Sequence, residues 1–200
     1  MDILLTFTGF HDPYSEGRVA GQSHPGPILS LLESKEFDRV FLFKTPGTAK
    51  ITDETKREIL KLHKNMKVEI LDINLPDPTA YGPILKGLRT HFKTIDQENE
   101  QADYFVSVAS GTPQMHACWF MLAASGEIPA KILHVRPPQY ATASVPIVSE
   151  IDVTTGHFPL VRFTEERKRE AAEEEPVMWA GGKRIVGEHP KFMTAFKRAK

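Results

Sequence analysis

The chain has 200 residues, of which 40% are hydrophobic and 26% charged, enough to bury one substantial core. A net charge of -1 and a pI near 6.7 lack the basic excess of a dedicated DNA- or RNA-binding domain, so we expect no direct binding of duplex DNA. The single cysteine, Cys118, excludes an intramolecular disulfide and a cysteine cluster for zinc, and it fits a reducing compartment.

The sequence also carries no predicted membrane, metal or cofactor signal. Its first residues, "MDILLTFTGF", have an acidic side chain where a signal peptide needs basic ones, and no apolar run approaches a membrane span. His24, His116 and His134 do not have the spacing of metal ligands. We therefore expect a soluble cytoplasmic protein with no membrane partner, no metal and no cofactor.

Apolar strand-like segments alternate with longer amphipathic ones. Strands are predicted at 2–8, 39–43, 67–72, 103–109 and 131–135, and helices at 26–35, 52–65, 80–98 and 113–125. Thr52 and Thr55 are read as the start of the second helix, and Pro113 and Gly126 delimit the last. This alternation predicts an α/β fold, a Rossmann-like and mainly parallel sheet with helices on both faces.

The alternation of predicted strands and helices changes after residue 146. The stretch "PIVSEIDVTTGHFPLVRF" predicts one or two further strands around the turn at Thr155 and Gly156, a C-terminal strand pair. "TEERKREAAEEE" then predicts a charged linker helix. In the final stretch Phe192, Met193 and Phe196 have helical spacing, as at the start of a further domain that is absent from this chain.

In open α/β sheets ligands bind beyond the carboxyl ends of the strands. The loops to inspect are therefore 8–25, 44–51, 73–83, 109–113 and 136–146. In "VASGTPQMH", Gly111 permits close approach of an anion and Ser110 and Thr112 offer hydroxyls, which favours a phosphate, while Gln114 or His116 would contact an attached base or sugar. The alternative is that Ser-Gly-Thr-Pro is only a helix N-cap followed by proline.

Other residues near predicted strand ends have both a functional and a structural interpretation. Lys44 and Thr45 face a phosphate or belong to a solvated turn, and Arg136 is expected to point into the crevice. His11 and Asp12 form a polar lid or acid–base pair, or they only decorate a surface loop. Trp119 and Phe120 lie in mid-helix among apolar neighbours, so we expect them in the core, not stacked on a base.

The stretch "SVASGTPQMHACWFMLAASGEIPAKILHVRPP" resembles the CRISPR-associated Rossmann-fold (CARF) domains. It is most similar to the sensor domain at the N-terminus of RNA-repair-type (RtcR-like) sigma-54-dependent transcriptional regulators. "IVGEHPKFMTAFKRA" resembles the segment that leads into the AAA+ module of such regulators. The resemblance implies a CARF-like ligand-sensing domain at 1–165, followed at 166–200 by a charged linker and the start of an absent AAA+ sigma-54-interaction domain.

The resemblance further implies binding of a cyclic oligoadenylate or a related RNA-end ligand across the two-fold axis of a homodimer. Sigma-54 RNA polymerase would be contacted only through the absent domain. The implied ligand loops comprise Thr8, Gly9 and Phe10 and then Ser110, Gly111, Thr112 and Gln114. Many ligand-binding members carry Lys or Arg one turn into the following helix, whereas this chain has Met115, His116 and Ala117.

Two functions compete on these residues. A passive sensor needs only different ligand affinities in two states and no catalysis. A metal-independent ring nuclease would align a ribose 2′-OH with its own 3′-phosphate, using Ser110, Thr112, His116 and Lys44. We favour the sensor, because the pocket lacks an unmistakable base and the C-terminal segment implies an output domain. A nucleotide-cofactor enzyme is disfavoured, because the glycine fingerprint is missing.

Overall fold

A computed structural model describes residues 1–16, 23–137, 140–142, 144–151, 178–180 and 183–185. The chain divides into two compact units, Met1–Val161 and Arg162–Lys200. The candidate site lies in the first.

The first unit is built on a six-stranded sheet with the order β5-β4-β1-β6-β7-β8. Its strands are β1 (Asp2–Phe7), β4 (Arg39–Lys44), β5 (Lys67–Asp72), β6 (Asp103–Ser107), β7 (Ala130–Val135) and β8 (Val148–Ile151). All neighbouring pairs are parallel except β7 and β8, which are antiparallel. The chain moves outward from β1 to β5 and then returns to the other side of β1, so the strand order reverses between β1 and β6.

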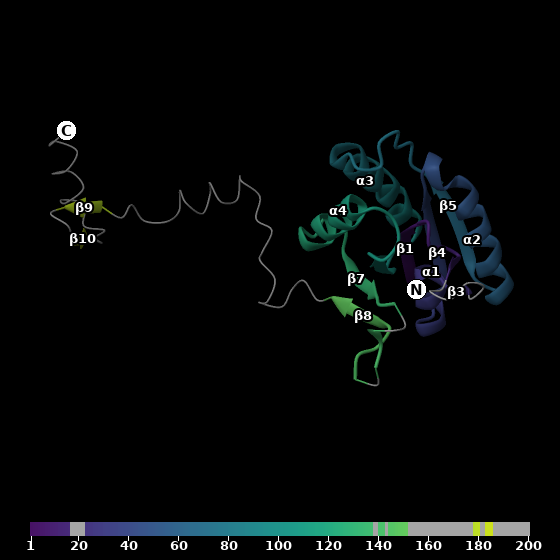
Figure 1. Cartoon of the computed structure of the whole chain (residues 1–200). Helices are drawn as coiled ribbons and strands as arrows, with labels where there is room; N and C mark the ends of the chain where they lie inside the picture. Colours follow the sequence, from purple (N-terminus) through teal and green to yellow (C-terminus); the bar gives the residue numbers. More distant parts are fainter. Residues whose placement is uncertain (17–22, 138–139, 143, 152–177, 181–182, 186–200) are drawn as a thin grey trace. The chain divides into compact units, whose positions relative to one another are not determined.

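Helices cover both faces of this sheet (Figure 1). They are α1 (Pro27–Ser34), α2 (Ala49–Leu62), α3 (Tyr81–Glu98) and α4 (Pro113–Ala124), with a 3₁₀ turn η1 (Pro46–Thr48) before α2. Residues of α3 and α4 pack on one face in a core that includes Ile3 and Leu5, while α1 and α2 pack on the opposite face around Leu4. Alternate β1 side chains thus serve two cores, as a strand buried on both faces requires.

Trp119 extends from α4 into the core that α3 and α4 cover. Its ring centroid lies 5.4 Å from that of Phe43 and 6.1 Å from that of Phe7, and the side chain is fully buried. Phe120 is partly buried against the same core. The prediction is confirmed for Trp119, while Phe120 contacts the core from a partly exposed position.

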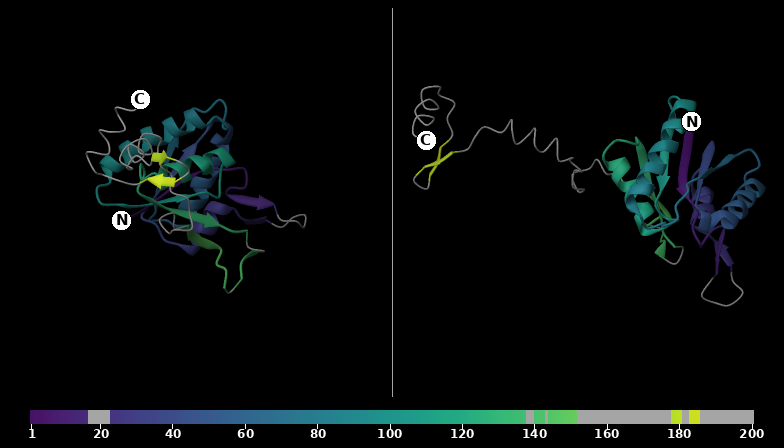
Figure 2. Two further views of the ribbon diagram at one scale, coloured as in Figure 1. Left: turned by 90° about the vertical axis from the view of Figure 1, so that its left-hand side faces the viewer. Right: turned by 90° about the horizontal axis from the view of Figure 1, so that it is seen from above.

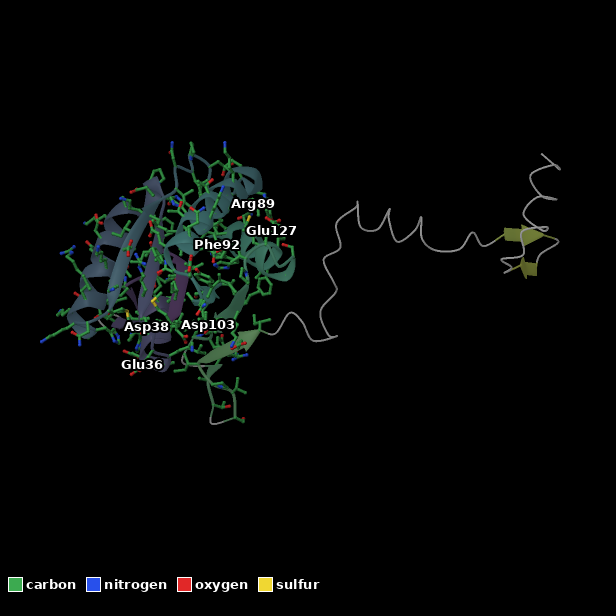
Figure 3. All side chains as sticks on the ribbon, turned by 180° about the vertical axis from the view of Figure 1, so that it is seen from behind. Glu36, Asp38, Arg89, Phe92, Asp103 and Glu127 are labelled. Carbon is green, nitrogen blue, oxygen red and sulfur yellow. The ribbon has the colours of Figure 1, made fainter. Side chains whose placement is uncertain are left out.

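An ion pair on the surface joins α3 to the turn after α4. The Arg89 guanidinium donates from Nη2 to Glu127 Oε1 at 2.8 Å, and its Nε donates to the other carboxylate oxygen (Figure 3). Because the contact is bidentate, it fixes the relative orientation of the two side chains.

The predicted fold class is confirmed, with two local corrections. Helix α2 begins at Ala49, so Thr52 and Thr55 do not start it; their hydroxyls donate to Thr48 O and Ile51 O inside the helix. The predicted loop 8–25 also contains an antiparallel hairpin, β2 (Tyr14–Glu16) and β3 (Ser23–Pro25), which stands out from the sheet (Figure 2). The Tyr14 hydroxyl donates to Glu58 Oε2 of α2 at 3.2 Å.

After residue 146 the structure describes one predicted strand and a strand pair at positions where none was predicted. Strand β8 lies where the first strand after residue 146 is predicted. An antiparallel pair, β9 (Met178–Ala180) and β10 (Lys183–Ile185), follows in the second unit. The turn at Thr155 and Gly156, the charged linker helix and the predicted helix around Phe192 lie outside the described residues. No helix that the structure describes is long and apolar enough to cross a membrane.

Candidate functional site

Two loops meet where the strand order reverses, one after β1 and one after β6. A Cβ atom added to Gly9 would lie only 2.8 Å from the backbone nitrogen of Gly111, so the two backbones are in direct contact. The Ser110 hydroxyl donates to Asp12 Oδ2 at 2.7 Å, which joins the same loops through side chains. Two of the predicted ligand segments, far apart in sequence, are therefore adjacent at the carboxyl edge of the sheet.

The second loop needs glycine at position 111. Gly111 has φ +106°, and a Cβ there would lie 2.9 Å from Met115 Sδ and 3.1 Å from Phe7 Cβ. A side chain would be strained by the backbone conformation and would also meet the core. The chain consequently leaves bare backbone at this point of the edge.

Thr112 connects this loop to both neighbouring elements. It is the N-cap of α4, with its Oγ1 accepting from Met115 N at 3.3 Å, and Pro113 takes the first helical position. The same hydroxyl donates to the carbonyl oxygen of Pro78 at 2.9 Å, in the loop between β5 and α3. The structural interpretation of Ser-Gly-Thr-Pro as a helix cap is confirmed. Pro113 has no N–H, Met115 N donates to Thr112 Oγ1 and His116 N donates to Thr112 O, so the first helical turn leaves the Gln114 N–H for a ligand.

His116 lies against the buried Ser110. Its Nε2 is 3.1 Å from the Ser110 carbonyl oxygen, and since a carbonyl only accepts, Nε2 is the donor. Burial lowers the pKa of His116 below its ordinary 6.5, the Ser110 contact opposes this, and the positive charge of a protonated His134 adds to it. The ring is thus held neutral near pH 7, with its lone pair on Nδ1.

Thr8 and Thr45 are buried within a chain of threonine hydroxyls. Thr8 Oγ1 lies 2.6 Å from Thr52 Oγ1, Thr52 donates to Thr48 O at 2.8 Å, and Thr48 Oγ1 lies 3.2 Å from Thr45 Oγ1. This chain ties the β1 loop to the loop after β4. A ligand contact by either Thr8 or Thr45 would have to compete with these bonds.

The two predicted cations have protein partners. Lys44 Nζ lies 2.8 Å from Asp72 Oδ1, and this hydrogen bond raises the pKa of Lys44. Arg136 Nη1 donates to Pro146 O at 3.0 Å and to Ser149 Oγ at 3.2 Å, so its guanidinium binds the segment leading into β8.

Phe10 and Gln114 complete the predicted set. Phe10 follows Gly9 directly and is 79% exposed, which is unusual for a phenylalanine. Gln114 is partly buried at the second position of α4. Both lie beside the contact between Gly9 and Gly111.

The structure reveals one functional residue whose role the sequence interpretation missed. Asp12 is 4% exposed, and its carboxylate accepts from Gly9 N, Ile28 N and Ser110 Oγ. The sequence placed it with the exposed His11 in a lid or acid–base pair. Two of its partners lie 16 and 98 residues away, so no local pattern indicates them.

Among the described residues no group of three or more His, Cys, Asp or Glu side chains is arranged to hold a metal ion. The Ser110 and Thr112 hydroxyls donate to Asp12 and to Pro78 O, and the His116 Nε2–H donates to Ser110 O. The candidate site therefore offers a ligand the bare backbone around Gly9 and Gly111, the N-terminus of α4 and the acceptor Nδ1 of His116.

Comparison with known proteins identifies the family. The model of the family RtcR, described as "Regulator of RNA terminal phosphate cyclase", matches residues 18–175. The chain belongs to the RtcR family. The transcriptional regulatory protein RtcR of Escherichia coli (strain K12) is 25% identical over 150 residues. That match covers 72% of this chain and 28% of the relative, so the chain spans just over a quarter of the length of this RtcR protein.

Solved structures bear on the fold of this RtcR-family chain. Csm6 from Enterococcus italicus, bound to cyclic hexa-2′-fluoro-hexa-dAMP, superimposes with a TM-score of 0.60 at 18% identity, covering 100% of this chain and 44% of Csm6. Can2 from Sulfobacillus thermosulfidooxidans, in complex with cyclic tetra-adenylate, gives a TM-score of 0.46 at 14% identity, covering 68% of this chain and 32% of Can2. The resemblance to CARF domains of RtcR-like regulators is confirmed for family and fold.

Proposed function

We propose that the first unit is a ligand-sensing domain that binds a cyclic oligoadenylate or a related RNA-end ligand at the contact between the β1 and β6 loops. The observation that carries the proposal is the approach of Gly9 to Gly111, directly before the capped start of α4. Bare backbone at a helix N-terminus suits a phosphate. The exposed Phe10 next to it offers a ring on which a base stacks. The ligand bound to Csm6 supports the choice of ligand class.

Within this site we propose graded roles for the predicted residues. Gly9, Gly111 and Thr112 approach the phosphate, and Phe10, Gln114 and His116 contact the base or sugar. The remaining predicted residues, whose polar groups are already bonded within the domain, support the loops: Thr8, Lys44, Thr45, Ser110 and Arg136.

A ring of adenylates has its own symmetry, so a site on a two-fold axis needs only one patch per subunit. We propose that α4 forms this axis. Pro113–Ala124 contains no charged residue, and Met121 on it is 38% exposed, whereas a helix facing water normally has a polar side. Since Thr112 caps the N-terminus of α4, pairing along this helix would bring two copies of the site together.

In the longer protein this domain would control a sigma-54-type transcription activator. We propose 1–165 as the sensor and 166–200 as the linker and start of the AAA+ module, which alone would contact sigma-54 RNA polymerase. The support is membership of the RtcR family and the 28% coverage of the E. coli regulator.

Titration calorimetry tests the ligand. The panel comprises cyclic tetra-adenylate, cyclic hexa-adenylate, linear hexa-adenylate and an RNA ending in a 2′,3′-cyclic phosphate. Saturable binding of a cyclic ring or of the RNA end supports the proposal, at one ring per two chains if the ligand is cyclic. Absence of binding by every member at 100 µM contradicts it, that concentration being about the weak end of specific recognition.

Light scattering tests the dimer with matched variants. Met121→Glu places a charge on the uncharged face of α4, and Leu62→Glu places one at the exposed end of α2, where Leu62 is 52% exposed. We expect a dimer for the wild type and Leu62→Glu, and a monomer for Met121→Glu. A monomeric wild type at tens of micromolar, or an unchanged dimer in Met121→Glu, contradicts the arrangement.

A ring nuclease is the second candidate, favoured by the neutral His116 beside Ser110. Its Nδ1 would accept the proton of a ribose 2′-OH, whose oxygen bonds to the adjacent 3′-phosphorus as the P–O5′ bond breaks, with Thr112 and Lys44 near the developing charge. The departing 5′-oxygen takes a proton from the protonated His116 or from water, so the products would carry 2′,3′-cyclic phosphate and 5′-hydroxyl ends. Incubation of excess cyclic tetra- and hexa-adenylate with the protein in EDTA decides between the candidates. Multiple turnovers would establish the nuclease, and intact rings after tight binding would support the sensor.

A further inference from the structure

The buried carboxylate of Asp12 joins three segments of the domain. Oδ2 accepts from the Gly9 backbone N–H at 3.0 Å and from the Ser110 hydroxyl at 2.7 Å, while Oδ1 accepts from the Ile28 N–H at 3.1 Å. Gly9 belongs to the first ligand loop, Ser110 to the second, and Ile28 to the first turn of α1. One side chain therefore holds both loops in register with a helix that is packed in the core.

Asp12 also fills the N-terminus of α1. Ile28 is the second residue of that helix, so the carboxylate lies at the positive end of its dipole. The start of the helix is closed further by Gly26, whose N–H donates to Pro13 O at 2.7 Å and where a Cβ would lie within 3 Å of His11 O and Pro13 O. In dinucleotide-binding Rossmann domains this place, after the first strand, receives the pyrophosphate. Here the protein places its own carboxyl group, whose pKa is raised by burial, an effect that the hydrogen bonds from Ser110, Gly9 and Ile28 oppose.

A carboxylate taken out of water needs its hydrogen bonds, and those bonds are strong because the acceptor is charged. Both carboxylate oxygens of Asp12 accept hydrogen bonds, and the donors belong to Gly9, Ile28 and Ser110. Movement of the Gly9 loop relative to the Ser110 loop would leave that carboxylate short of a donor. The separation of the loops is thereby fixed.

We propose that Asp12 is a positioning residue that holds the Gly9 loop against the Ser110–Thr112 loop. Because its side chain also occupies the N-terminus of α1, a ligand phosphate would bind at the N-terminus of α4 instead. The part of this inference that concerns affinity rests on the proposed function. The part that concerns how Asp12 holds the loops does not.

Asp12→Asn is the informative variant, because asparagine has one acceptor oxygen and an NH₂ group that only donates. It keeps the shape of the side chain but cannot accept on both sides, so at least one of the Gly9 and Ile28 N–H bonds is lost. Asp38→Asn is the matched control. Asp38 Oδ2 also accepts a backbone N–H, from Asp2 at 2.8 Å, but it precedes β4 at the opposite edge of the sheet (Figure 3).

Amide hydrogen exchange measures, in the absence of ligand, how firmly Asp12 holds the two loops and the start of α1. We expect exchange at Gly9 or Ile28 to become about tenfold faster in Asp12→Asn, the loss expected for one charge-assisted bond, and to be unchanged in Asp38→Asn. If Asp12→Asn does not fold, Ser110→Ala replaces it. That variant keeps the cap of α1 and should accelerate exchange at Gly111 and Thr112 but not at Ile28. Wild-type exchange at these amides in the folded variant overturns the proposal.

Affinity is measured on the same variants with cyclic hexa-adenylate and with an RNA ending in a 2′,3′-cyclic phosphate. At a temperature where circular dichroism shows all variants folded, we expect Asp12→Asn to weaken whichever probe binds by about tenfold and Asp38→Asn to leave it within twofold. Faster exchange with unchanged affinity overturns the positioning role. If the wild type binds neither probe, the proposed ligand fails while exchange still decides whether Asp12 holds the loops.

Discussion

The backbone nitrogen of Gly111 lies 2.8 Å from the position that a Cβ atom of Gly9 would occupy. These glycines lie in the loops that follow the two strands between which the sheet reverses its order, and only the absence of a side chain at residue 9 lets the loops touch. The candidate site therefore depends on this contact.

Gly9→Ala is expected to push the two loops apart and to weaken ligand binding, because the new methyl group meets backbone, which cannot rotate away. Gly47→Ala is the matched control, since a Cβ there has nothing within 4 Å. Calorimetry with whichever probe binds the wild type should show an affinity at least fivefold lower for Gly9→Ala and an unchanged affinity for Gly47→Ala. A fivefold loss of affinity corresponds to roughly 1 kcal/mol. Equal affinities would refute the importance of the contact.

Gly111→Ala is expected to lower the free energy of unfolding by about 1–3 kcal/mol, because φ +106° is unfavourable for alanine and Met115 Sδ blocks the methyl group. Urea denaturation measures the loss. A variant as stable as the wild type would show that the loop adopts another conformation.

Thr112→Ala removes the cap of α4 together with the hydrogen bond to Pro78. We expect a loss of about 1 kcal/mol in stability, along with weaker ligand binding. Thr112→Ser keeps the hydroxyl and should restore both properties. If serine restores stability but not affinity, the threonine methyl group and not the cap contributes to the ligand site.

Trp119→Ala should destabilise the fold by about 3–5 kcal/mol, because it empties the space between Phe7 and Phe43. Trp119→Phe should cost much less, because it also removes an indole N–H that has no partner among the described residues. Leu62→Ala, at the exposed end of α2, is the control. Thermal melting of the three variants should preserve this order, and a stable Trp119→Ala would place the aromatic ring outside the core.

The stability should also depend on pH through His116. Burial lowers the pKa of this histidine in the folded state below the 6.5 of an ordinary imidazole. As the pH falls below 6.5, the unfolded chain takes up the proton before the folded chain does, so the free energy of unfolding decreases until the pH passes the folded pKa. Urea midpoints at pH 7.5 and 5.5 should differ less in His116→Gln than in the wild type.

Local sequence determined the elements that depend only on near neighbours. The apolar runs of β1, β4 and β6 and the Thr112-Pro113 cap of α4 follow from periodicity and from contacts within one helical turn, and the structure has them where they were predicted. The loop at Ser110–Thr112 was identified as a candidate site from its own residues, which are small or carry hydroxyls and lie between a predicted strand and a predicted helix. The β2–β3 hairpin was missed, because three-residue strands carry almost no period.

Only the tertiary structure decided which of these segments meet. The sequence does not encode locally that Gly9 touches Gly111, that Thr8 bonds to Thr52, or that Arg136 turns back to Pro146. Asp12 shows the physical reason. Beside its polar neighbours it reads as a surface residue, and its burial arises when the sheet order brings Ser110, 98 residues later, against the same loop and supplies the donors that a buried carboxylate requires.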